Sequence, residues 1–168
     1  MKLLKKHTVI KYLWSLLLTT MLFSCKNSEP IAKEERIPFT AIKSGNNSSS
    51  EVYKTMVINN QEELIEAWSL FFVKFNRKPP IPNIDFTSKT LVAVFLGERN
   101  NGGYSIKIKS VIKTNDKIAI VTEETKPGSS CMSTSVMVYP FQLIEIPKTN
   151  KPFAFTKTIT INDCDKDF

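Results

Sequence analysis

Histidine is almost absent from this chain of 168 residues, since the only one is His7 and the 161 residues after it contain none. An imidazole takes the proton of the nucleophile in Ser-His-Asp and Cys-His hydrolases, and it is a ligand in the common catalytic zinc sites. The sequence therefore excludes these enzyme classes. Ser129, Ser130 and Ser133 are accordingly predicted to be loop or strand residues and not nucleophiles.

Carboxylates offer little catalytic chemistry either. Glu123 and Glu124 are adjacent, and neighbours on a strand point to opposite faces, so they are poorly placed to act as an acid and base pair on one bond. Asp163, Asp165 and Asp167 alternate like the opening of a calcium loop, but the required glycine and closing glutamate are missing. We therefore expect no catalytic residue, no metal site and no cofactor, and the protein is predicted not to be an enzyme.

Glycine is also scarce, yet Gly97, Gly102 and Gly103, three of the five in the chain, lie within seven residues. They follow Leu91–Leu96, an apolar run too short for a typical helix and rich in strand-forming residues, which predicts a central strand with both faces covered. The loop composition suits a tight connection that needs positive φ before Tyr104 starts a new strand. The loop lacks Walker spacing and does not enter a helix, so we expect no phosphate site.

No apolar run is long enough for a membrane span, which needs about 20 residues. A basic leader, Met1–Lys11, is followed by about a dozen mostly apolar residues, Tyr12–Phe23, and by Cys25. The tetrad Leu22-Phe23-Ser24-Cys25 resembles the bacterial lipobox, in which the cysteine sulfur takes a diacylglyceryl group. This resemblance implies a lipoprotein signal peptide over residues 1–24 and a lipid anchor at Cys25. An ordinary secretory peptide is the alternative.

The predicted location is thus the bacterial cell envelope, anchored to a membrane by lipid, with the leaflet left open. Removal of the first 24 residues, which hold four lysines and no acidic residue, would lower the net charge from +7 to +3. So mild a charge does not predict a nucleic-acid partner. Residues 25–37 mix charged and polar residues with Pro30 and are predicted to be a flexible tether, and residues 38–168 a single globular domain.

Cysteine is limited to three residues, and after lipidation of Cys25 an even pair remains. In an exported chain such a pair, Cys131 and Cys164, favours a disulfide bond. Two independently buried thiols remain the alternative, because the sequence does not show whether the two Cα atoms come within about 7 Å of each other.

The domain is predicted to have an α+β fold, with one amphipathic helix packed on a largely antiparallel β-sheet of about seven strands. Asn60 is placed as the N-cap of the helix, with Glu63 three residues later, and an apolar stripe from Leu64 to Phe75 is expected to pack on the core. The extended segments are Pro38–Lys43, Glu51–Ile58, Leu91–Leu96, Tyr104–Thr114, Lys117–Glu124, Met132–Tyr139, Phe141–Ile146 and Phe153–Ile161.

Four short motifs carry a resemblance to a known family. Gly97-Glu98-Arg99 and Gly102-Gly103-Tyr104-Ser105 follow the hydrophobic strand, and Lys126-Pro127-Gly128 and the run Tyr139–Lys148 come later. Together they resemble the C-terminal domain of the protease complex subunit PrcB, over roughly Thr55 to Lys148. The resemblance implies a non-catalytic, membrane-tethered subunit that assembles with or stabilises an exported protease or another envelope complex.

The loop Gly97–Gly103, here called the glycine loop, is the predicted contact with that protein partner together with Tyr104. A buried strand fixes the base of this loop, and Arg and Tyr often anchor interfaces. The candidate residues are Gly97, Glu98, Arg99, Asn100, Gly102, Gly103, Tyr104 and Tyr139. The opposing interpretation is that the glycines serve only the turn and that Tyr104 points into the core. Alternative functions are a protease inhibitor of the chagasin type, a small-ligand-binding lipoprotein and, less favoured, an enzyme that uses carboxylates alone.

Overall fold

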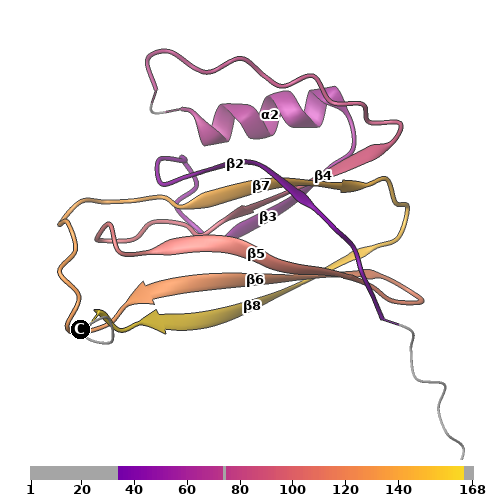
Figure 1. Ribbon diagram of the computed structural model, residues 1–168. Helices are drawn as coiled ribbons and strands as arrows, with labels where there is room; N and C mark the ends of the chain where they lie inside the picture. Colours follow the sequence, from indigo (N-terminus) through magenta and orange to yellow (C-terminus); the bar gives the residue numbers. More distant parts are fainter. Residues whose placement is uncertain (1–33, 74, 165–168) are drawn as a thin grey trace, which may run out of the picture. The chain divides into compact units, whose positions relative to one another are not determined.

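Two four-stranded β-sheets and one helix make up the part of the chain that the computed structural model describes, residues 34–73 and 75–164. Sheet A has the strand order β1-β5-β6-β8 and sheet B the order β2-β7-β4-β3 (Figure 1). The elements are β1 (Glu35–Arg36), β2 (Thr40–Gly45), β3 (Lys54–Ile58), α2 (Gln61–Phe71), β4 (Lys89–Phe95), β5 (Ser105–Lys113), β6 (Ile118–Pro127), β7 (Phe141–Pro147) and β8 (Phe153–Asn162).

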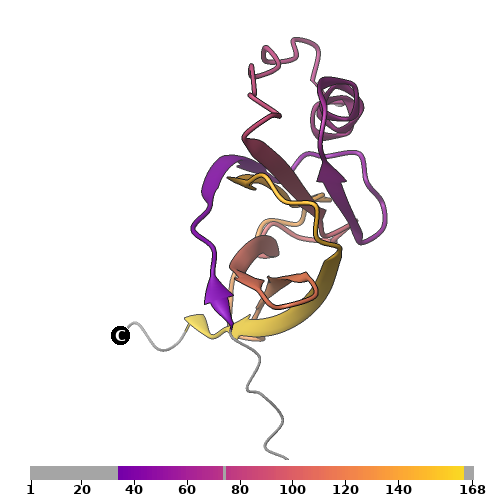
Figure 2. The same ribbon diagram turned by 90° about the vertical axis from the view of Figure 1, so that its right-hand side faces the viewer.

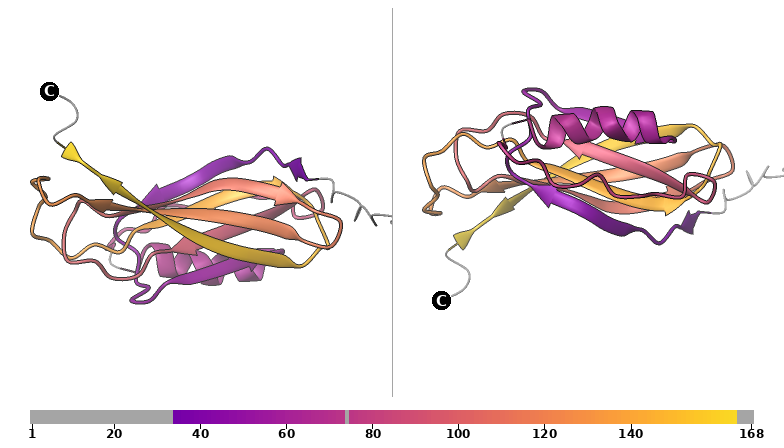
Figure 3. Two further views of the ribbon diagram at one scale, coloured as in Figure 1. Left: turned by 90° about the horizontal axis from the view of Figure 1, so that it is seen from below. Right: turned by 90° about the horizontal axis from the view of Figure 1, so that it is seen from above.

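The helix, sheet B and sheet A form three layers, which are separate in the end-on view (Figure 2). Seen from above, α2 lies over sheet B, and seen from below, sheet A forms the opposite face (Figure 3). The predicted α+β fold with a sheet-rich domain is therefore confirmed. The predicted signal peptide, the predicted lipidation site Cys25 and most of the predicted tether lie outside the described residues, as do Asp165 and Asp167.

Strand β4 is buried on both faces, as its uninterrupted apolar sequence predicts. Successive side chains of a strand point to opposite faces. Leu91, Ala93 and Phe95 accordingly pack in the cluster with the helix, while Val92 and Val94 pack in the cluster between the two sheets. The central position of β4, between β7 and β3, thus follows from the absence of any polar face on the strand.

Helix α2 begins where the sequence predicts. The Asn60 side chain accepts a hydrogen bond from the Glu63 N–H at 2.9 Å, and the Glu63 carboxylate accepts one from the Asn59 N–H at 2.7 Å. The predicted core packing of the aromatic residues is also confirmed, because the Phe71 ring stacks on those of Phe95 and Phe141 with centroid distances of 5.0 and 4.6 Å.

The same helix ends earlier than the apolar stripe predicts. Its last residue is Phe71, Phe72 is the C-cap, and Phe75 lies beyond the helix and is 41% exposed. The Trp68 indole N–H donates to the Pro79 carbonyl oxygen at 3.0 Å. The chain therefore folds back along the helix within a few residues, and it can do so only if the helix stops before Phe75.

Two further segments differ from the sequence-based expectation, and a third has a pairing direction that the sequence did not predict. Met132–Tyr139, predicted to be extended, forms no strand, because its only β-bridges are the isolated ones Arg99–Val138 and Asn47–Tyr139. Strand β8 pairs with β6 in parallel, whereas the other pairs are antiparallel. Strand β1 forms inside the predicted tether, where Glu35 and Arg36 pair with β5, so the folded domain begins before residue 38.

Candidate partner-binding site at the glycine loop

The glycine loop connects β4 to β5, and its first residue is fixed by the backbone of the segment before β3. Gly97 has φ of +88°, a conformation that favours glycine, and the Glu98 N–H donates to the Glu51 carbonyl oxygen at 3.0 Å. A Cβ atom at Gly97 would lie 2.8 Å from the carbonyl carbon of Val52. Any side chain at this position would therefore push two backbone segments apart.

Gly102 and Gly103 also permit close packing. The Gly102 N–H donates to the Thr134 carbonyl oxygen at 3.0 Å, and a Cβ atom at Gly102 would collide with the Thr134 hydroxyl. A Cβ atom at Gly103 would lie 2.8 Å from the Pro127 Cβ atom. These two glycines thus hold the loop against the end of β6 and against the segment between β6 and β7, which spans the two sheets at this end of the molecule (Figure 1).

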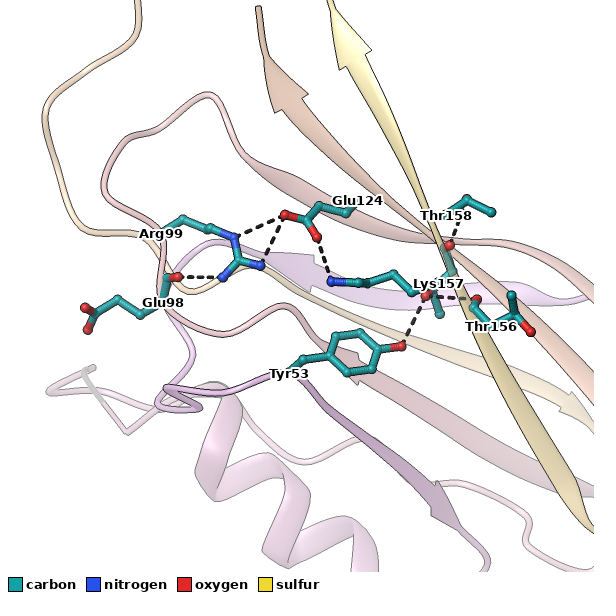
Figure 4. A network of polar contacts seen from close by, with 8 residues as sticks. Tyr53, Glu98, Arg99, Glu124, Thr156, Lys157 and Thr158 are labelled. Atoms are coloured by element: carbon teal, nitrogen blue, oxygen red, sulfur yellow. Dashed lines mark hydrogen bonds and ion pairs between the residues drawn. The ribbon is translucent and has the colours of Figure 1, made fainter.

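Arg99 is turned inward. Its backbone forms a two-way bridge with Val138, with N···O distances of 2.8 and 2.9 Å. Its Nε and Nη2 atoms donate to Glu124 Oε1 at 3.2 and 3.1 Å, and Nη1 donates to the Glu98 carbonyl oxygen at 2.7 Å (Figure 4). Its side chain is 25% exposed, so most of the guanidinium is engaged within the fold.

Glu124 is the buried centre of this arrangement. It lies on β6 with Ile118 and Ile120, whose side chains pack between the sheets, and its own side chain is 2% exposed. Lys157 on β8 donates to Glu124 Oε2 at 2.8 Å. Burial alone would raise the pKa of Glu124, but the hydrogen bonds and positive charges of Lys157 and Arg99 outweigh it and lower the pKa.

Tyr53 extends the network to the segment that precedes β3. The Lys157 ammonium lies 5.0 Å from the centroid of the Tyr53 ring, and the Tyr53 hydroxyl is 3.2 Å from that of Thr122. Figure 4 shows Tyr53, Lys157, Glu124 and Arg99 converging from different parts of the chain. The network therefore ties the glycine loop to sheet A and to the start of β3.

Glu123 has a separate set of partners, as expected for neighbours on a strand. Its carboxylate forms ion pairs with the ammonium groups of Lys109 and Lys107, at N···O distances of 2.6 and 2.9 Å. It also accepts a hydrogen bond from the Thr160 hydroxyl at 3.1 Å. Hydrogen bonds from Lys109 and Lys107 lower the pKa of Glu123 to about 2. Glu123 and Glu124 thus form two different ion clusters and not an acid and base pair.

Tyr139 and Glu98 meet at the outer side of the loop. The Tyr139 hydroxyl donates to Glu98 Oε2 at 2.6 Å, and this hydrogen bond raises the pKa of Tyr139. Tyr104 instead packs against the cluster between the sheets, with its ring centroid 5.7 Å from the Arg99 guanidinium. The sequence-predicted residues thus divide into an inward group, Arg99 and Tyr104, and an outward group in which Glu98 and Asn100 are exposed.

The predicted disulfide is confirmed. Cys131 and Cys164 are joined by an S–S bond, with their Cα atoms 5.2 Å apart. The Gly128 N–H also donates to the Asn162 carbonyl oxygen at 2.8 Å. The start of the segment between β6 and β7 is therefore fixed to the end of β8.

Exposed apolar side chains that the sequence analysis did not single out lie on two segments that are hydrogen-bonded to the loop. They belong to the segment before β3 and to the segment between β6 and β7: Val52 is 69% exposed, Met132 101%, Val136 52% and Met137 51%. The pattern of residues 132–139 predicted a strand, in which half of these side chains would have been buried. The side chains of Met132, Val136 and Met137 are exposed because residues 132–137 pair with no neighbouring strand, which the sequence does not show.

The described residues contain no cluster of three or more His, Cys, Asp or Glu side chains placed to hold a metal ion. In the same residues, every buried side-chain nitrogen and oxygen atom has a hydrogen-bond partner. No helix in the described part of the chain has the length and apolarity needed to cross a membrane.

These features define a helix-covered β-sandwich whose charged groups at the glycine loop are paired with one another. Residues 90–147 match the family model described as PrcB C-terminal, which confirms the resemblance carried by the four motifs. The matched region runs from β4 to the end of β7 and includes the whole loop with Arg99 and Glu124, whereas Tyr53 and Lys157 lie outside it. The family suggests a role as a subunit associated with a protease complex. No curated protein and no solved structure matches the chain.

Proposed function

We propose that this protein is a non-catalytic, lipid-anchored subunit that binds a protein of an exported protease complex. The binding surface is the end of its β-sandwich that carries the glycine loop, here called the loop end. The observation that carries the proposal is the group of exposed apolar side chains, Val52, Met132, Val136 and Met137, beside the glycine loop. Apolar side chains gathered on a surface are typical of protein interaction sites, and methionine adapts well to an irregular partner surface.

The backbone that carries these side chains is held from several sides. The Cys131–Cys164 bond, the bridge between Arg99 and Val138 and the hydrogen bond from Gly102 to Thr134 fix the segment between β6 and β7. A surface that is already ordered loses less conformational entropy when it binds. In this proposal Arg99 supports the interface from within, and Glu98 and Asn100 offer polar contacts at its rim.

The anchor is proposed to be Cys25, on the resemblance of its surroundings to a lipobox. The nine residues between Cys25 and Glu35 span at most about 30 Å when fully extended. A lipid-anchored protein would thus hold the sandwich near the membrane surface, where an exported partner can be captured. A Cys25→Ser form should leave the membrane fraction or keep its leader.

The test is capture of the full-length tagged protein from detergent-solubilised membranes of its own cells, with identification of its companions. A stoichiometric protease or protease-complex subunit is the expected result. Met137→Asp should reduce that capture at least tenfold, whereas Ile65→Asp, at a 50% exposed apolar position on α2, should not. Equal capture by both variants would show that the loop end is not the interface.

A peptidase assay of the captured complex separates the proposed role from inhibition. A binding subunit should leave the peptidase active, or more active, as it is added. Stoichiometric loss of peptidase activity would support the inhibitor alternative instead.

A further inference from the structure

A second concave site lies on the helix side of sheet B, and nothing in the proposed function uses it. It is a cavity of about 490 Å³ between the end of β2 with the residues that follow it, the C-terminal end of α2, and the proline-containing segment at residues 77–80. Cavities that bind small molecules usually measure about 300–1,000 Å³. Its size is therefore suited to one small ligand.

The apolar part of the cavity is aromatic. Phe72 and Phe141 are both 3% exposed, whereas Phe75 is 41% exposed, and all three line the cavity. The Phe72 ring centroid lies 5.5 Å from that of Phe75 and 6.2 Å from that of Phe141, with edge-on contacts. The exposed Phe75 ring would be covered by an apolar group that enters the cavity.

The charged part of the cavity is purely cationic. Lys43, Arg77 and Lys78 line it, and no acidic residue does. Within residues 34–73 and 75–164 none of these three cations forms an ion pair. The Lys43 ammonium lies 5.8 Å from the centroid of the Phe72 ring, so positive charge and aromatic surface are adjacent.

Hydrogen bonds hold the walls of the cavity in place. The Trp68 indole fixes the Pro79 carbonyl oxygen at 3.0 Å, and the Tyr139 N–H donates to the Asn46 carbonyl oxygen at 2.7 Å. The Ser49 N–H donates to the Leu70 carbonyl oxygen at 2.9 Å, which joins the loop after β2 to the helix. Backbone and indole hydrogen bonds therefore position three parts of the cavity wall.

We propose that this cavity binds a small organic anion, a carboxylate attached to an aromatic or aliphatic body. The body would pack on Phe72 and Phe75, and the carboxylate would receive charge-assisted hydrogen bonds from Arg77 and Lys78. Charge complementarity supports an anion, and the volume of the cavity, about 490 Å³, supports a small molecule. The proposal is independent of the proposed function, because it uses none of the exposed side chains beside the glycine loop.

Trp68 provides the readout. It contacts Phe72, with ring centroids 4.9 Å apart, and holds Pro79, so a ligand in the cavity should change its fluorescence. The chain carries one other tryptophan, Trp14, which lies in the proposed signal peptide and is absent from the processed form. The probes are 4-phenylbutyrate and its neutral counterpart 4-phenylbutyramide, titrated into this form in a non-ionic detergent.

We expect saturable binding of 4-phenylbutyrate, at least tenfold tighter than that of the amide and weaker at high salt. The double variant Arg77→Gln/Lys78→Gln should lose about tenfold in affinity for the carboxylate and little for the amide. Lys117→Gln, a cation at the β5–β6 turn, is the matched control and should bind normally. Unchanged melting temperatures show that both variants fold.

Equal binding of the acid and the amide, or unchanged affinity in the double variant, would overturn the assignment of an anion site. Failure of 4-phenylbutyrate to saturate, together with saturable binding of an acidic aromatic peptide, would overturn the small-molecule assignment and indicate a protein-docking site. Capture of a protease complex is measured separately, so either result leaves the test of the proposed function intact.

Discussion

The glycine loop and the cavity beside α2 both contain an arginine with lysines nearby, yet they use positive charge in opposite ways. At the loop, Arg99 and Lys157 both form ion pairs with the buried Glu124. At the cavity, Arg77 and Lys78 have aromatic rings beside them and no acidic neighbour in the lining. The comparison teaches that a motif residue can serve the fold, while residues outside any motif remain available for a ligand.

The largest expected effect on the free energy of unfolding comes from the Cys131–Cys164 disulfide bond. Removal of the disulfide by Cys131→Ser and Cys164→Ser should lower the free energy of unfolding by about 3 to 4 kcal/mol, because the bond closes a separation of 33 residues. Denaturant unfolding of the oxidised protein and the double variant measures this difference. Equal midpoints would show that the bond adds no stability to the sandwich.

The next effect separates a structural arginine from a binding one. Arg99→Ala leaves Glu124 buried with Lys157 as its remaining cation, so the free energy of unfolding should fall by about 2 to 3 kcal/mol, or roughly 10 °C in melting temperature. Lys113→Ala, which breaks an exposed pair with Glu35, should change it by less than about 1 kcal/mol. A stable Arg99→Ala protein that fails to capture its partner would instead place Arg99 at the interface.

A smaller effect should appear in the pH dependence of stability. Since the pKa of Glu123 is lowered to about 2, its ion pairs stabilise the fold above its ordinary value near 4.5, and this stability is lost as the pH falls from 4.5 towards 2. We expect about 1 kcal/mol, because Lys107 and Lys109 are more than half exposed and water screens the pairs. In Glu123→Gln the unfolding free energy should fall less steeply over this range.

The smallest effect is expected at the cavity. Arg77→Gln and Lys78→Gln should change the unfolding free energy by less than about 0.5 kcal/mol, because neither side chain has an ion pair to lose. Thermal unfolding of each variant beside Arg99→Ala tests the contrast directly. A loss comparable to that of Arg99→Ala would mean that the cavity cations support the fold.

Much of the fold followed from local patterns, and the site did so only in part. The apolar run of β4, the N-cap at Asn60 and the even pair of cysteines each predicted a feature that the structure confirms. For the loop, the sequence located the glycines and the contact of Tyr139 with this region. It did not predict that Arg99 points to Glu124, because Glu124 is 25 positions further along the chain, on the strand after β5.

What the sequence alone determined are features set within a few residues: strand and helix type, the helix start, the turn at Gly97 and the lack of histidine chemistry. The tertiary structure decided the rest, including where α2 ends, the parallel pairing of β8 and the absence of a strand at residues 132–139. It also decided which cations are paired and which line a cavity. The physical reason is that strand pairing, burial and ion pairing depend on neighbours distant in sequence, which local periodicity does not specify.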